Sequence, residues 1–117
     1  MHDTERHHSI IRELLDNMNR LEPELSSLYG DNPWKPRSAA LLRKAAAVLQ
    51  AQYRQAFCDW STTLRPNSML EHEIAELSET FDVLYEHINA ETNNTLGPMW
   101  SHYSDDQLYE LMIAGVI

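Results

Sequence analysis

The chain has 117 residues, a net charge of -9 and 43% hydrophobic residues. This length supports one hydrophobic core rather than two, so we expect a single domain over residues 1–117. Three Gly and five Pro are too few for a turn-rich β fold, and a single cysteine, Cys58, excludes an intrachain disulfide. No run approaches the ~18 apolar residues of a membrane span, and the polar start has no apolar leader, so the sequence predicts a cytoplasmic protein without a membrane partner.

The first expected helix begins at Asp3 or Thr4, either of which can act as its cap. Apolar residues recur in it at three- and four-residue steps, as on the packed face of a helix. This face consists of His7, Ile11, Leu14, Met18, Leu21, Leu25 and Leu28. Pro23 removes a backbone donor from the pattern, so we expect either a kink there or a short second piece that begins near it. Gly30 then ends the region in a tight turn.

Pro33 and Pro36 flank Trp34 in the stretch that follows, which predicts a stiff connector. Ser38 is the expected cap of a second long helix that continues to about Leu64. Its apolar face is Leu42, Ala46, Leu49, Tyr53, Ala56, Trp60 and Leu64, and we expect Cys58 to be a small buried thiol beside it. This helix and its flanks hold six of the nine basic residues, namely Lys35, Arg37, Arg43, Lys44, Arg54 and Arg65.

The third long helix, residues 69–92, has the most regular apolar pattern in the chain. Its apolar face is Leu70, Ile74, Leu77, Phe81, Leu84 and Ile88. The opposite face carries Glu76, Glu79, Asp82 and Glu86, which we call the acidic stripe, and no Lys or Arg lies anywhere in residues 69–92. At ~1.5 Å of rise per residue, these carboxylates are about 5 Å apart along the axis. A row of one sign costs repulsion, so we expect it to serve a function.

The short connection before the third helix predicts an antiparallel hairpin with the second, in which opposite charges lie side by side. Residues 91–104 are expected to form a loop that carries Trp100 and Tyr103. Ser104 and Gln107 form a capping box, which predicts a short C-terminal helix. The apolar end, residues 111–117, should dock on the bundle or on another subunit. The predicted fold is therefore an all-α bundle of three long helices, the first kinked or split at Pro23, plus a short C-terminal helix.

The charge is unevenly distributed along the chain. Residues 1–65 hold all nine Lys and Arg against eight acidic residues, whereas residues 66–117 hold ten acidic residues and no Lys or Arg. This asymmetry argues against direct binding to nucleic acid or anionic lipid and favours a partner with a basic surface. The alternative is a solvated acidic surface that aids solubility.

Three histidine–glutamate pairs lie at metal-binding spacing, namely Glu5 with His8, His72 with Glu76, and His87 with Glu91. Helical bundles that hold paired metals project such pairs into the core, but the core positions here are apolar. We therefore expect no bound metal and no cofactor. Surface positions are the expected locations of these histidines.

Residues 73–88, EIAELSETFDVLYEHI, resemble the all-α nucleotide pyrophosphohydrolases of the MazG type. That family holds magnesium with a Glu-x-x-Glu pair and, on a following helix, an acidic pair that ends in Asp. Glu73 with Glu76 and Glu79 with Asp82 supply both spacings. Here both pairs fall on one expected helix without the intervening turn, so they cannot face each other across a cleft within one subunit. No catalytic residue is carried over, and such an enzyme, or another metal-binding bundle, is the alternative function.

In size, acidity, helical build and lack of a catalytic motif, the chain is similar in character to the anti-CRISPR and antirestriction inhibitors that phages carry against host defence. The resemblance implies that the acidic stripe occupies a basic nucleic-acid groove, with carboxylates in place of phosphates. Trp34 and Trp100 are further candidates for partner binding, because exposed tryptophans often anchor interfaces. Alternatively, both close the ends of the bundle. We expect a non-enzymatic protein that binds a basic protein surface, such as a nucleic-acid-binding defence complex, with a homodimer as a further candidate.

Overall fold

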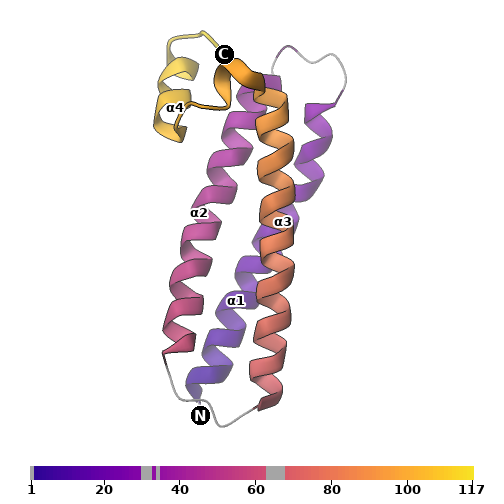
Figure 1. Cartoon of the computed structure of the whole chain (residues 1–117), viewed down its shortest axis with the longest axis vertical. Helices are drawn as coiled ribbons and strands as arrows, with labels where there is room; N and C mark the ends of the chain where they lie inside the picture. Colours follow the sequence, from indigo (N-terminus) through magenta and orange to yellow (C-terminus); the bar gives the residue numbers. More distant parts are fainter. Residues whose placement is uncertain (1, 30–32, 34, 63–67) are drawn as a thin grey trace.

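The computed structural model describes residues 2–29, 33, 35–62 and 68–117. Its helices are α1 (His2–Leu21), the 3-10 helix η1 (Glu22–Leu28), α2 (Lys35–Ser61), α3 (Ser68–Trp100) and α4 (Asp105–Ile113). Within these ranges no residue forms a β-strand. The three long helices lie along a molecule of 52 × 25 × 19 Å, and α4 packs at one end (Figure 1). The prediction of an all-α bundle with three long helices and a short C-terminal one is confirmed.

The core lies between the three long helices, with α1 and α3 parallel to each other and α2 antiparallel to both (Figure 1). The largest fully buried side chains are Phe81, Ile11, Met18, Ile74, Ile88, Leu108 and Thr92. Tyr53 of α2 stacks on Phe81 of α3, with ring centroids 4.3 Å apart. Full burial of an aliphatic or aromatic side chain contributes about 1.5–3 kcal/mol. The apolar faces predicted from the sequence therefore supply most of the core.

The first helix breaks at the expected place. α1 ends at Leu21, and η1 follows with Pro23 in its first turn, where the missing N–H has no helical partner to lose. Leu25 of η1 remains buried, so the apolar face continues through the break. The predicted start is corrected, because the backbone is already helical at His2 and Asp3 therefore lies inside α1.

α2 begins at Lys35, earlier than predicted. Pro36 belongs to its first turn rather than to a connector, because proline's fixed φ angle suits a helix start. Ser38 consequently lies inside the helix and is not its cap. α2 ends at Ser61, and the predicted end at Leu64 falls outside the described residues.

α3 extends beyond its predicted end at Thr92. Thr92 and Leu96 are buried and continue the apolar face from Ile88 at four-residue steps, which keeps the segment that was predicted as a loop helical. The hydroxyl of Thr92 donates to the carbonyl oxygen of Ile88 at 2.8 Å, so its burial leaves no unpaired group. Gly97, at φ 75° and ψ 179°, breaks the helix before its last turn, which ends at Trp100.

The capping box that starts α4 is confirmed. The Gln107 amide donates to Ser104 Oγ at 3.2 Å, and the Ser104 amide donates to Gln107 Oε1 at 2.8 Å. Arg37 of α2 donates to the carbonyl oxygens of Met112 and Ile117, which ties the C-terminal residues to the bundle. The predicted docking of this apolar end is confirmed only in part, because Leu111, Met112 and Ile117 pack on the core whereas Ile113 and Val116 are exposed.

Arg43 of α2 holds the segment between α3 and α4. Its guanidinium donates to the carbonyl oxygens of Ser101 at 3.2 Å and Tyr103 at 2.7 Å, and to Asn93 Oδ1 at 3.3 Å. Its Nε lies 3.1 Å from Asp105 Oδ1. One side chain of α2 therefore fixes the end of α3, the connection and the start of α4.

None of the described helices combines the length and the apolar character needed to cross a lipid bilayer.

Candidate functional site

The acidic stripe lies on the solvent face of α3, and all four of its side chains are exposed. A helix turns by about 100° per residue, so each three-residue step moves a side chain about 60° around the axis. The stripe therefore winds obliquely across the face. Glu76 stands on the α1 side, where it lines a hollow with Arg12, and Asp82 stands on the α2 side, near Tyr53.

No lysine or arginine among the described residues neutralises the stripe. Within the part of the chain that the structure describes, no Lys or Arg forms an ion pair with its four carboxylates. Glu76 has a histidine neighbour instead, with 3.1 Å between its Oε1 and His72 Nε2, and both side chains are well exposed. The predicted charge pairing across the α2–α3 hairpin is thus wrong for Arg43. This side chain instead donates hydrogen bonds to the carbonyl oxygens of Ser101 and Tyr103, before α4.

Two other carboxylates of α3 have partners on the α1 side. Glu73 Oε2 lies 2.9 Å from His8 Nε2, so His8 pairs across two helices rather than with Glu5. Glu91 accepts a hydrogen bond from the Tyr29 hydroxyl at 3.3 Å, and its negative charge raises the pKa of Tyr29. These two residues connect helices and are not part of the free acidic surface.

Asp82 differs from the rest of the stripe because it borders α2. Burial is the main cause that raises the pKa of Tyr53, and the negative charge of Asp82 raises it further. Ser78 and Arg54 act in the opposite direction. The outward-facing part of the stripe therefore consists of Glu76, Glu79 and Glu86.

Two adjoining hollows border the stripe on its α1 side. The first is lined by Glu76, Glu79, Thr80, Val83 and Leu84. The second is lined by His8, Arg12, Glu73, Glu76, Leu77 and Thr80, and it shares Glu76 and Thr80 with the first. We call the two together the α1–α3 groove. Both hollows are open to solvent, so the groove is a shallow surface feature.

Val83 is the residue of this surface that sequence reasoning missed. Its side chain is 61% exposed and lies in the first hollow among the carboxylates. Its position in the sequence indicates this location, because Val83 follows Glu79 by four residues and precedes Glu86 by three. This spacing places Glu79, Val83 and Glu86 on one face of the helix. The regular spacing of the carboxylates predicts a charged face, and a single apolar residue within it adds no periodic signal of its own.

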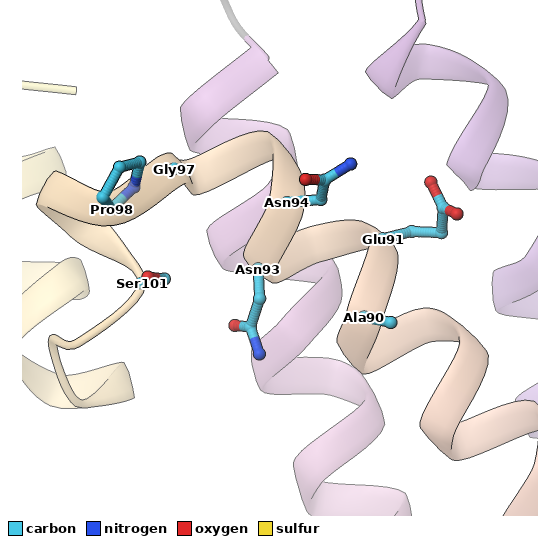
Figure 2. A pocket seen from close by; sticks show the side chains of 7 residues that line it. All are labelled: Ala90, Glu91, Asn93, Asn94, Gly97, Pro98 and Ser101. Carbon is cyan, nitrogen blue, oxygen red and sulfur yellow. The ribbon is translucent and has the colours of Figure 1, made fainter.

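Trp100 is partly buried and packs against the core, edge-on to Tyr103 with ring centroids 5.6 Å apart. This position favours the alternative that it closes the end of the bundle. A separate open hollow at the Gly97 break lies nearby, and Figure 2 shows its lining, which includes Asn93, Asn94 and Pro98 but not Trp100. Trp34, the other tryptophan predicted to bind a partner, lies outside the described residues.

The described residues contain no group of three His, Cys, Asp or Glu side chains placed to hold a metal ion. Glu73, Glu76, Glu79 and Asp82 lie on the uninterrupted part of α3, as the sequence predicts. Cys58 is exposed, which corrects the expectation of a buried thiol. It lies five residues after buried Tyr53, about 140° around α2 and thus away from the core.

No protein-family model, curated protein or solved structure matches the chain.

Proposed function

We propose that this protein is a non-enzymatic binding protein whose acidic stripe docks on a positively charged surface of another protein. The observation that carries the proposal is the exposed row of carboxylates, to which no described Lys or Arg is paired. An exposed row of one sign repels itself and destabilises the free protein. A basic partner attracts the carboxylates and offsets the repulsion between them. Both effects favour formation of the complex.

The basic surface is one that otherwise holds nucleic acid. Carboxylates about 5 Å apart along a helix present repeated negative charge, as does the phosphate backbone of a nucleic acid, which basic proteins contact with Lys and Arg. By occupying such a groove the protein acts as an inhibitor, as anti-CRISPR and antirestriction proteins do. The described side chains of the stripe stand on a rigid helix, so their spacing is preserved on binding.

The test is capture of partners from a bacterial lysate by three forms of the protein. Glu79→Lys with Glu86→Lys reverses two exposed charges of the stripe, and Glu13→Lys with Glu110→Lys makes the same net change at exposed sites elsewhere. We expect the wild type and the control to capture the same partner and the stripe variant to lose it. Capture should weaken with rising salt, and duplex DNA should compete for the partner.

A partner that the stripe variant retains in full contradicts the proposal. If Trp100→Ala or Trp34→Ala abolishes capture while the stripe variant does not, recognition belongs to the tryptophans. Measurement of helical circular dichroism for each variant ensures that a loss of capture is not a loss of fold.

A further inference from the structure

We infer that the partner contacts the α1–α3 groove with an amphipathic basic segment, in which an apolar side chain sits on Val83 and Leu84 while Lys or Arg side chains meet Glu76 and Glu79. This inference rests on the proposed function and specifies the chemistry of the partner. A pure mimic of phosphates needs only charge. The structure places an exposed apolar side chain inside the acidic surface, so a partner can make an apolar contact beside the charged ones.

The lining of the first hollow combines these two chemistries within about two turns of helix. Val83 and Leu84 form its apolar part, and Glu76 and Glu79 stand beside them. Lys and Arg have aliphatic stems that pack on apolar surface while their charged ends reach nearby carboxylates. A neighbouring Leu or Ile on the same segment would bury Val83, which is 61% exposed in the free protein.

The second hollow gives the bound segment a direction. Arg12 lines it together with His8, whose Nε2 already lies 2.9 Å from Glu73. A cation placed beside Arg12 would be repelled, so the basic side chains of the segment gather in the first hollow, on the Glu79 side of Glu76. The Arg12 end instead suits a hydrogen-bond acceptor, such as a carbonyl oxygen or a carboxylate of the partner.

Two synthetic peptides of equal length and charge test the inference by fluorescence anisotropy at low salt. One alternates Arg and Leu, and the other alternates Arg and Ser. We expect the Arg–Leu peptide to bind the wild type on the order of tenfold more tightly, because it alone buries apolar surface. Val83→Ser should remove this difference and leave the affinity for the Arg–Ser peptide unchanged.

Val48→Ser is the matched control, because Val48 is 51% exposed but lies on α2, away from the groove. It should leave the preference for the Arg–Leu peptide intact. Arg12→Glu should tighten binding of the Arg–Leu peptide more than Arg20→Glu, which makes the same charge change in the last turn of α1. Equal effects of Val83→Ser and Val48→Ser, or of the two arginine variants, overturn the inference.

The stripe variant Glu79→Lys with Glu86→Lys separates the two proposals. If it loses both peptides while Val83→Ser changes nothing, the acidic stripe binds by charge alone, and only the apolar contact is overturned. If it binds both peptides as tightly as the wild type does, the proposed function itself fails. Loss of binding in the stripe variant, together with loss of the Arg–Leu preference in Val83→Ser, supports both.

Discussion

Arg43 is the side chain on which the C-terminal third of the fold depends most. Its guanidinium is partly buried and reaches two backbone carbonyls and the Asp105 carboxylate. Hydrogen bonds to a charged group contribute about 1.5–3 kcal/mol each, and a planar fork serves several acceptors in fixed directions. The lysine ammonium is a point charge that cannot reproduce this pattern.

We predict that Arg43→Ala lowers the free energy of unfolding by about 2–4 kcal/mol and that Arg43→Lys recovers only a minor part. Urea denaturation followed by circular dichroism measures both. Arg54→Ala on the same helix is the control, because the exposed Arg54 should cost less than about 0.5 kcal/mol. Equal costs at the two positions would show that Arg43 does not hold the C-terminal region.

At the scale of elements, α3 shows what the sequence can and cannot predict. Its apolar face was predictable because spacing alone places Ile74, Phe81 and Ile88 on one side of a helix, and all three are fully buried. Its length was underestimated because Asn, Thr and Gly-Pro are typical of loops. Tertiary contacts keep this segment helical, since Leu96 is buried and Asn93 accepts a hydrogen bond from Arg43 of α2.

The same distinction applies to the candidate site. The acidic stripe could be predicted, since helical spacing determines which residues share an exposed face. The α1–α3 groove could not, because it depends on how α1 lies beside α3, and no local pattern contains that information. The partners of long basic side chains are equally hard to predict from sequence. Arg43, for example, donates a hydrogen bond to the Tyr103 carbonyl oxygen.

The break in α3 depends on Gly97, and we predict that Gly97→Ala costs about 1–3 kcal/mol. A Cβ atom there would meet no atom within 4 Å, so the cost comes from the backbone conformation alone, at φ 75° and ψ 179°. Gly97→Asn should not rescue stability, because asparagine tolerates the left-handed helical region but not this extended one. Thermal unfolding measures both variants, and an unchanged melting temperature in Gly97→Ala would contradict the prediction.

At the scale of the whole molecule, the net charge of -9 opposes compactness. Salt screens such repulsion with a Debye length of ~10 Å at 0.1 M. We therefore predict that the melting temperature of the wild type rises with salt concentration. Each Glu→Lys reversal adds two charge units, so Glu79→Lys with Glu86→Lys carries -5 and should show a smaller rise. A melting temperature that falls with salt would mean that attractive ion pairs dominate.

The parallel arrangement of α1 and α3 also has a consequence for the folding of the chain. The two helices are separated in sequence by the whole of α2, and His8 of α1 and Glu73 of α3, which pair across this boundary, are therefore far apart along the chain. Contacts this distant close a longer loop than the local α2–α3 hairpin does, so forming them costs more chain entropy. An intermediate with only that hairpin would carry the acidic stripe but lack the groove. A partner that uses the groove would therefore distinguish the folded protein from a chain in which only the hairpin has formed.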